Sequence, residues 1–262
     1  MRFYQLTELI GHTPIVKFHD VFVKLEMYNP SGSIKDRPAK FIIQKLLETK
    51  QIKPGDTIIE ATSGNMGIAL AYYALVYKLH AIIVMPDHVT KERIQRIKAL
   101  RGEVILTDHT KAMSGAIAKV HELLKDHDYY YIDQFHNINN VRSHQSTSQE
   151  IWEDLPNVDY VVAGIGTGGT IRGISKYLKK YNPEIKIVGV EPTESPVISQ
   201  GRCGPSLIPG IGSDFIPPLL DHEPLETIID EMITVSSKDA HDLWKKLNNQ
   251  GLMVGISSAA AI

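Results

Sequence analysis

Short apolar segments alternate with longer helical patterns along almost the whole chain, and this alternation constrains the fold more than any other feature. The segments that read as strands are residues 22–26, 57–60, 81–85, 103–107, 129–133, 160–163 and 186–190. The helical patterns between them cover residues 37–49, 66–78, 91–100, 111–125 and 170–180. Alternation of this kind favours mostly parallel, twisted sheets flanked by helices. The sequence therefore predicts an α/β fold.

Composition limits the classes of partner. The formal net charge of −2 gives no basic surface for nucleic acid or an acidic membrane. No apolar run approaches the roughly 18 residues of a membrane span, and the N-terminus lacks a signal-peptide pattern. The single cysteine, Cys203, excludes a disulfide framework and favours a reducing compartment. We therefore expect a cytoplasmic protein.

Eleven histidines raise the question of a metal site, but their spacing argues against one. His121 and Glu122 begin like a zinc-protease motif, yet Lys125 stands where the second histidine should be. Scattered solvent-exposed histidines explain the pattern better, so no metal is expected.

The first segment that could take part in a reaction is residues 29–37, NPSGSIKDR, which follows a predicted strand and opens a helix. On spacing alone, Lys35 is better explained as a solvated surface lysine. The sharper hypothesis is a Schiff-base lysine, because a primary amine in a polar cleft can condense with an aldehyde and later act as a base.

Two further segments lie between a predicted strand and a predicted helix, where open α/β sheets bind ligands. Residues 62–67, TSGNMG, gather hydroxyls and an amide at a helix N-terminus, which suits a carboxylate or phosphate. A capping turn with Ser63 or Asn65 as the N-cap explains them equally well. Residues 164–170, GIGTGGT, predict a phosphate loop.

That glycine loop also leaves a rival open. Gly164, Gly166 and Gly169 fit the dinucleotide fingerprint, and Glu191 stands at about the distance of a ribose contact. A nicotinamide-binding Rossmann unit is therefore an alternative. Near the C-terminus, Ser257 or Ser258 is expected to cap a helix.

Together these segments resemble the cysteine synthase and cystathionine β-synthase family of fold-type-II pyridoxal-phosphate enzymes. The resemblance runs from residues 10–14, IGHTP, to residues 255–258, GISS. The lysine turn, the TSGN segment, the glycine loop and the terminal serine come in the family's order and approximate spacing. Further matches are Gln134 with Phe135, residues 191–193 with 195–196, and residues 210–212 with 215–217. A Rossmann unit predicts none of these.

The resemblance implies two α/β domains with pyridoxal 5'-phosphate in the cleft between them, as in the tryptophan synthase β fold. The smaller, mobile domain would span residues 36–139, and the larger would combine residues 1–35 with 140–262. Residues 259–262, AAAI, look like the first turn of a helix, so we expect a shortened C-terminus.

The resemblance also assigns roles. Lys35 would form the internal aldimine and then remove the substrate α-proton. Residues expected to hold the cofactor phosphate are Gly166, Thr167, Gly168, Gly169 and Thr170. Asn65 would bond the ring hydroxyl, and Ser257 the pyridine nitrogen. Residues expected to bind the substrate, chiefly its α-carboxylate, are Thr62, Ser63, Asn65, Met66, Gln134 and Gly210.

The serine at the pyridine nitrogen bears on the reaction. A neutral hydroxyl cannot keep the ring nitrogen protonated as an aspartate would, so the ring is a weaker electron sink. A long-lived quinonoid is then disfavoured relative to loss of the β-substituent. The product of that loss, an aminoacrylate, would accept sulfide or a thiol.

Three departures from the family pattern affect substrate choice. Met66 replaces a threonine, and residues 204–209, GPSLIP, differ from the usual GPHKIQ. Asp214 lies in GIGSDF, where cysteine synthases resemble GIGAGF and cystathionine β-synthases GIGYDF. An acid there could bind a second ammonium group or activate a poor leaving group, which would make it catalytic. The bland alternative is a solvated loop carboxylate.

The leading hypothesis is a cysteine synthase that joins an O-activated serine to sulfide. The alternative is a cystathionine β-synthase-like enzyme, or one that releases hydrogen sulfide from cysteine. A non-catalytic relative that binds a partner's C-terminal peptide is a different class, and the intact Lys35 argues against it. The nicotinamide enzyme comes last. The family also implies a homodimer and the C-terminal peptide of serine acetyltransferase as a partner.

Overall fold

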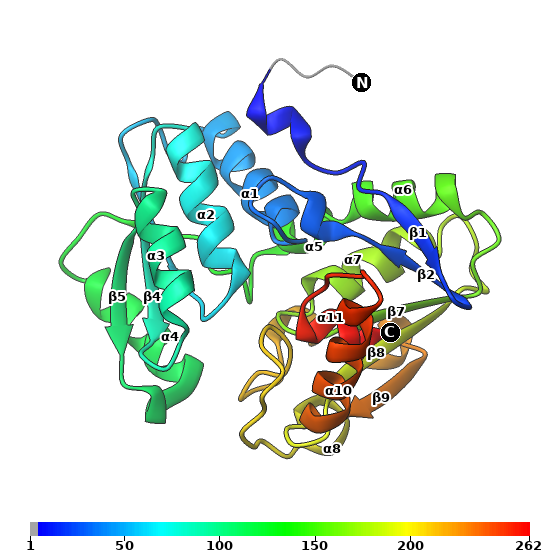
Figure 1. The fold of residues 1–262 in the computed structure, drawn as a ribbon. Coiled ribbons are helices and arrows are strands. Elements are labelled where there is room, and N and C mark those ends of the chain that lie inside the picture. The colour runs from blue at the N-terminus through cyan, green and yellow to red at the C-terminus, as the bar shows by residue number, and fades with distance from the viewer. Residues whose placement is uncertain (1–4) are drawn as a thin grey trace. The chain divides into compact units, whose positions relative to one another are not determined.

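The computed structural model describes residues 5–262, and the chain divides into two compact units (Figure 1). Unit 1 comprises Met1–Thr13 and Glu26–Asn139, and unit 2 comprises Pro14–Leu25 and Asn140–Ile262. Residues 26–35 cluster with unit 1 because their side chains bond to helices of that unit. The division expected from the sequence, residues 36–139 against 1–35 with 140–262, stays a prediction.

Unit 1 contains a four-stranded sheet in the order β5-β4-β3-β6, and every neighbouring pair is parallel. Its strands are β3 (Thr57–Ala61), β4 (His80–Pro86), β5 (Glu103–Thr107) and β6 (Tyr130–Tyr131). Its helices are α1 (Asp36–Glu48), α2 (Asn65–Val76), α3 (Lys91–Ala99) and α4 (Ala112–Leu123). Short 3-10 turns are η1 (Leu6–Leu9), η2 (Glu26–Tyr28) and η3 (His109–Lys111).

Helices cover both faces of this sheet, which explains why its central strands are apolar almost throughout. Ile58 and Ile83 face a core shared with α1 and α2, where Tyr73 is completely buried. Successive residues of a strand point to opposite faces. Accordingly, Ile59 and Val84 join Ala116 and Val120 of α4 in a second core.

Unit 2 contains a parallel sheet in the order β7-β8-β9 and an antiparallel hairpin, β1-β2. The strands are β1 (Ile15–Phe18), β2 (Val21–Lys24), β7 (Tyr160–Gly164), β8 (Lys186–Pro192) and β9 (Glu231–Val235). The longer helices are α6 (Gln145–Asp154), α7 (Gly169–Leu178) and α10 (Ser237–Asn249). The shorter ones are α5 (Ile138–Arg142), α8 (Val197–Gln200), η4 (Pro218–Leu220), α9 (Leu225–Ile228) and α11 (Ile256–Ala261).

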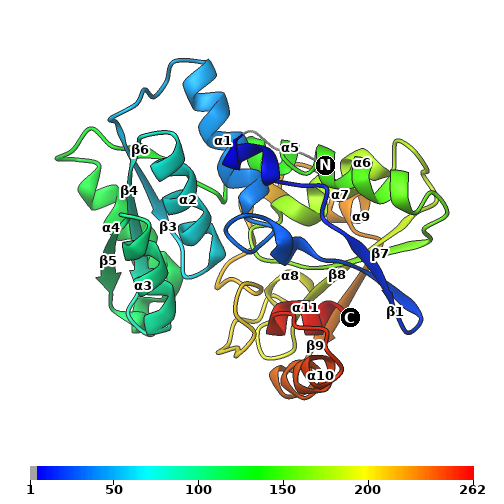
Figure 2. The same ribbon diagram turned by 45° about the horizontal axis from the view of Figure 1, so that its top comes forward.

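Figure 2 shows α6 and α7 on one side of the β7-β8-β9 sheet and α10 and α11 on the other. One core joins Ile187 of β8 to Ile171 and Leu178 of α7. The other joins Val190 of β8 to Ala240 of α10 and Ala260 of α11. The α/β fold predicted from the sequence is therefore confirmed. No helix of residues 5–262 is long and apolar enough to cross a membrane.

The structure corrects two expectations about helix caps. The N-cap of α2 is Gly64, and no side chain caps that helix, so neither Ser63 nor Asn65 has this role. The N-cap of α11 is Gly255, again without a side-chain cap bond. At the start of both helices the N-cap is a glycine, and the neighbouring polar side chains do not cap the helix.

Helix α7 lies close to the segment that joins α5 to α6 because it carries glycine at the point of contact. A Cβ on Gly173 would lie 2.5 Å from the carbonyl oxygen of Val141 and 2.7 Å from Cβ of His144. Both distances are shorter than real Cβ contacts, and the nearer neighbour is backbone. Any side chain at this position would push α7 away.

Gly173→Ala should therefore destabilise the protein by about 1–3 kcal/mol, the usual penalty of overpacking a close contact. Urea denaturation would measure the change as a lower midpoint. Gly255→Ala is the matched control, because Gly255 has a φ of −78° and a Cβ added there would have no neighbour within 4 Å. That control should change stability by less than about 0.5 kcal/mol. Equal effects in the two variants would contradict this account of α7.

Candidate active site

The lysine turn is organised around the carboxylate of Asp36, the residue that follows Lys35. One oxygen of Asp36 accepts the N–H of Ser31 at 2.8 Å, and the other accepts the Ser31 hydroxyl at 2.6 Å and the N–H of Ser33 at 3.3 Å. The hydroxyl of Tyr73 on α2 donates a further bond of 3.1 Å. Asp36 is completely buried, and burial raises the pKa of its carboxyl despite these donors. The turn is thereby closed over a single buried group.

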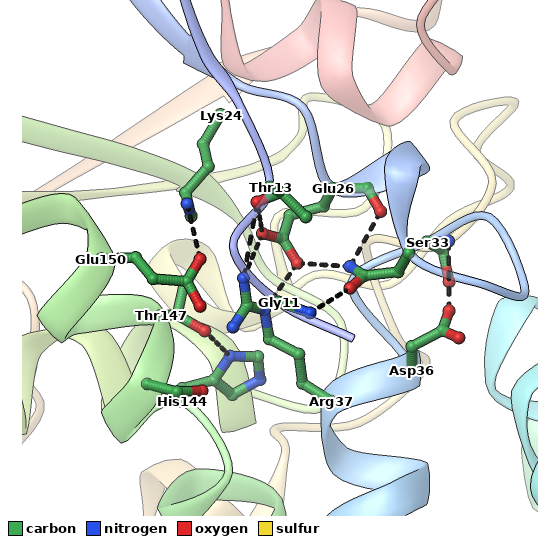
Figure 3. Close-up of polar contacts among 12 residues, drawn as sticks. Gly11, Thr13, Lys24, Glu26, Ser33, Asp36, Arg37, His144, Thr147 and Glu150 are labelled. Atoms are coloured by element: carbon green, nitrogen blue, oxygen red, sulfur yellow. Dashed lines mark hydrogen bonds and ion pairs between the residues drawn. The ribbon is translucent and has the colours of Figure 1, made fainter. Parts of the chain in front are cut away.

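A second cluster in unit 1 holds the same turn from the other side (Figure 3). Arg37 donates two bonds of 2.7 Å to the carboxylate of Glu26, the fork geometry of a strong ion pair. Glu26 also accepts the Thr13 hydroxyl at 2.6 Å and the Asn29 amide at 2.8 Å. The amide oxygen of Asn29 accepts the N–H of Gly11 at 2.9 Å. The IGHTP segment is thus a support for the lysine turn.

The amine of Lys35 is the group of this turn for which the sequence predicts a chemical role. Desolvation by burial lowers the pKa of Lys35 from 10.5 to about 8, although the residue as a whole is only partly buried. Near that pH a large share of the amine is neutral. A neutral amine can attack a carbonyl carbon or accept a proton, and an ammonium can do neither.

A second part of unit 1 suits an anion. The segment between β3 and α2 begins at Thr62, whose N–H donates to the carbonyl of Val84 at 2.9 Å and whose Oγ1 accepts the N–H of Gly64 at 3.2 Å. The first turn of α2 follows, where the N–H of Gly67 donates to the carbonyl of Gly64 at 3.1 Å and the N–H groups of Asn65 and Met66 precede the first bond of the helix. Ser63 is half-buried and Asn65 is exposed at the start of this turn. The carboxylate-binding role expected for this loop stays a prediction.

Met66 departs from the other residues of this loop. Its side chain is 1% exposed and belongs to the core beneath α2. Only its main chain is therefore available to a ligand. The methionine that replaces the family's usual threonine fills the core instead of lining the loop.

Gln134 lies beside this loop at the end of β3. Its side-chain amide donates to the carbonyl of Ala61 at 3.0 Å, and its backbone N–H donates to Glu60 at 3.3 Å. Glu60 is completely buried, and burial raises the pKa of its carboxyl well above the ordinary value. Asp133 adds to this shift. Burial therefore disfavours a negative charge on Glu60 beside this loop.

The glycine loop of unit 2 lies between β7 and α7. Gly168, the N-cap of α7, has a φ of +81°, which a residue with a Cβ rarely adopts, and a Cβ there would lie 2.7 Å from Leu220. Thr167 accepts a bond of 3.0 Å from the Asn140 amide, and the N–H of Gly169 is 3.4 Å from the same hydroxyl. The loop therefore presents main-chain N–H groups at a helix start, the usual setting for a phosphate.

His144, which the sequence did not single out, fixes the end of this loop. Its Nδ1 is 3.1 Å from the hydroxyl of Thr147 (Figure 3). Its Nε2 is 3.2 Å from the hydroxyl of Thr170. The HxxT spacing of His144 and Thr147 could have indicated a hydrogen bond between the imidazole ring and the threonine hydroxyl. The contact with Thr170, made across the α6–α7 packing, has no local signal.

Unit 2 also brings Gly210 and Ser257 to the glycine loop. A Cβ on Gly166 would lie 2.8 Å from the carbonyl oxygen of Gly210, and one on Gly210 would lie 4.0 Å from the hydroxyl of Ser257. These two close approaches place Ser257, in the first turn of α11, beside the loop. Asp214 is half-buried in the segment beyond Gly210.

Each unit, taken by itself, contains groups that fit a part of pyridoxal phosphate. An amine with a lowered pKa can take the aldehyde, a glycine loop at a helix start can take the phosphate, and a neutral hydroxyl can face the ring nitrogen. No cluster of metal-ligating side chains occurs within the described part of the chain.

Comparison with known proteins also indicates a pyridoxal-phosphate enzyme. A family profile described as pyridoxal-phosphate dependent enzyme matches residues 6–262. Cysteine synthase B of Campylobacter jejuni is 45% identical over 98% of this chain and 87% of its own length. O-acetylserine sulfhydrylase isoform 3 of Entamoeba histolytica is 39% identical with a TM-score of 0.92, over 100% of this chain and 82% of that one. A hydrogen sulfide-producing enzyme of Fusobacterium nucleatum is 39% identical with a TM-score of 0.93, over 98% and 89%.

The lowered pKa of Lys35 predicts how its amine reacts in the cofactor-free protein. The neutral fraction should rise through pH 8, so acetylation of Lys35 by acetic anhydride should show a midpoint near 8. Lys238 is the internal control, because its hydrogen bond to Asp242 raises the pKa of its ammonium above 10.5. Peptide mass spectrometry over a pH series measures both sites at once. Equal midpoints would show that burial does not activate Lys35.

Proposed function

The chain belongs to the family of pyridoxal-phosphate-dependent enzymes, and from this premise we propose that it makes L-cysteine from an O-activated serine and sulfide. It is an enzyme of the cysteine synthase type, as its relatives are. The observation that carries the proposal is the amine of Lys35, desolvated and held in a turn that is closed by buried hydrogen bonds.

Each unit would supply part of the machinery. When bound, the cofactor supplies an electron sink for the negative charge that develops at the substrate α-carbon. Neutral Lys35 would accept the α-proton at Nζ. Thr62, Ser63 and Gln134 would hold the α-carboxylate, and Asn65 would bond the ring hydroxyl. Residues 166–170 of unit 2 would hold the phosphate of the same cofactor.

Ser257 favours replacement at the β-carbon over competing reactions. Its hydroxyl can bond the ring nitrogen but cannot hold a proton there as a carboxylate would. The sink is therefore moderate, and departure of the β-substituent competes well with reprotonation of the α-carbon. Its position beside Gly210 and the glycine loop supports this role.

Three finer properties belong to the same proposal. The resemblance supports a homodimer and recognition of the C-terminal peptide of serine acetyltransferase, and the single cysteine supports a cytoplasmic location. Light scattering would test the dimer against the 29.3 kDa of one chain. A synthetic peptide that inhibits the enzyme would support the partner.

Lys35→Ala tests the proposed function. Loss of the amine removes both the attachment point and the base, so cysteine formation from O-acetylserine and sulfide should fall by more than about 10⁴-fold. Circular dichroism should be unchanged. Lys53→Ala, at an exposed lysine in the loop before β3, is the matched control and should keep full activity. Substantial turnover by the Lys35 variant would refute the assignment.

A second activity is favoured by Asp214. The segment that carries it is fixed by Gly212, which has a φ of +72° and donates to the carbonyl of Ile165 at 2.8 Å. We propose that this half-buried carboxylate allows use of a poor leaving group or a second amino acid. The alternative is then hydrogen sulfide release from cysteine, or synthesis of cystathionine. A relative with 39% identity is named as a hydrogen sulfide-producing enzyme.

Asp214→Asn separates the two activities. If the carboxylate acts as an acid or base, reactions that begin from serine or cysteine should lose roughly 10²–10⁴-fold in rate. Reaction of O-acetylserine with sulfide should lose far less, because acetate leaves readily and sulfide has no ammonium group to bind. Parallel assays of both substrate pairs measure the difference. Small, uniform losses would assign Asp214 to a solvated loop.

A further inference from the structure

Arg93 on α3 is linked to the carboxylate loop through a chain of hydrogen bonds. Its Nη1 donates to the carbonyl oxygen of Ser63 at 3.3 Å. That carbonyl shares a peptide unit with the N–H of Gly64, which donates to Oγ1 of Thr62 at 3.2 Å. This series of hydrogen bonds therefore runs from a guanidinium, through one peptide unit, to a hydroxyl that is expected to bind the substrate.

The packing of α3 fixes the start of this chain. Ile97 lies four residues after Arg93, on the same face of the helix, and is completely buried. A Cβ on Gly67 would lie 3.4 Å from Cδ1 of Ile97 and 3.1 Å from Cγ2 of Thr62. The contact that docks α3 therefore lies beside the loop and directs Arg93 toward it.

The positive charge of Arg93 polarises each hydrogen bond of this series in the direction of Thr62. Burial lowers the pKa of Arg93, but an arginine keeps its charge at neutral pH. Its donation to the Ser63 carbonyl makes the N–H of Gly64 a stronger donor, and that N–H in turn polarises the hydroxyl of Thr62. While Oγ1 accepts this bond, its own hydrogen can still be donated to a ligand. A carboxylate is the acceptor that gains most.

We propose that Arg93 is a positioning residue that strengthens binding of the substrate carboxylate, acting through the Ser63–Gly64 peptide and the hydroxyl of Thr62. The inference rests on the proposed function, because it takes the TSGN loop as the carboxylate site. It adds a residue outside the loop that sets the loop's affinity for an anion.

Arg96 provides a matched comparison on the same helix. Its Nη2 donates to the carbonyl oxygen of Ser31 at 2.9 Å, so it contacts the lysine turn instead of the TSGN loop. Loss of either arginine removes one cation and one bond to a backbone carbonyl, and loss of Arg96 also removes a 4.0 Å ion pair with the exposed Glu92. Only the loss of Arg93 interrupts the series of hydrogen bonds that ends at Thr62.

The experiment compares two ligands on the holoenzyme. L-Serine carries the carboxylate, and 2-aminoethanol is the same molecule without it. Each is titrated while the absorbance of the bound cofactor is followed, which gives a dissociation constant without turnover. Arg93→Gln should weaken serine by about 5- to 30-fold, the effect of a hydrogen bond to a charged group, and 2-aminoethanol by less than about twofold.

Two further variants complete the design. Arg93→Lys keeps the charge and should recover serine binding to within about twofold of the parent, since a cation remains near the carbonyl. Arg96→Gln should change the two ligands by the same factor. Circular dichroism and urea midpoints of all variants identify any that fail to fold.

Equal weakening of both ligands by Arg93→Gln would overturn the inference, because Arg93 would then only brace the structure. Unchanged binding of serine would overturn it too. If the parent holoenzyme responds neither to these ligands nor to O-acetylserine, the proposed function itself is wrong. If it responds to both and Arg93→Gln does not discriminate between them, only the inference fails.

Discussion

The buried carboxylate of Asp36 is the interaction on which the reactive part of unit 1 depends. A charge or a polar acid inside a protein is tolerated only when hydrogen bonds surround it, so Ser31, Ser33 and Tyr73 must take up fixed positions around it. The adjacent Arg37 has the same requirement, which Glu26 meets. These two side chains flank the start of α1 and determine the backbone there. The path of Lys35 follows from theirs.

The two loops proposed to bind anions, one in each unit, are built in the same way. In each, a parallel strand ends, the chain turns at glycine, and a helix begins: β3 leads to α2 through Gly64, and β7 leads to α7 through Gly168. Both turns lie at the carboxyl ends of strands, where open α/β sheets bind ligands. Main-chain N–H groups are the donors that each loop would offer to an anion. The side chains of Thr62 and Thr167 accept neighbouring N–H groups and so fix the loops themselves.

The sequence predicted the elements and loops whose signal is local. Strand β5 has the predicted bounds, and β3 and β7 extend the predicted strands by one residue. Strand β9 was missed because its charged and exposed positions, as in Glu231, obscure the apolar alternation. The caps were wrong because glycine, without a side-chain signal, is the N-cap of both α2 and α11. The pairing of Glu26 with Arg37, and of Arg93 with a backbone carbonyl, depends on tertiary packing that no local pattern encodes.

The desolvated amine of Lys35 also affects the energetics of folding. With a pKa of about 8 in the folded protein and 10.5 as its ordinary value, this group is protonated in the unfolded chain and neutral in the folded one between those two pH values. The unfolded chain then binds more protons, so this lysine's contribution to stability increases as the pH rises through that window. Below pH 8 the cofactor-free protein must enclose an ammonium group that water would solvate better. Reactivity and stability are thus opposed at one nitrogen atom, and the fold favours reactivity.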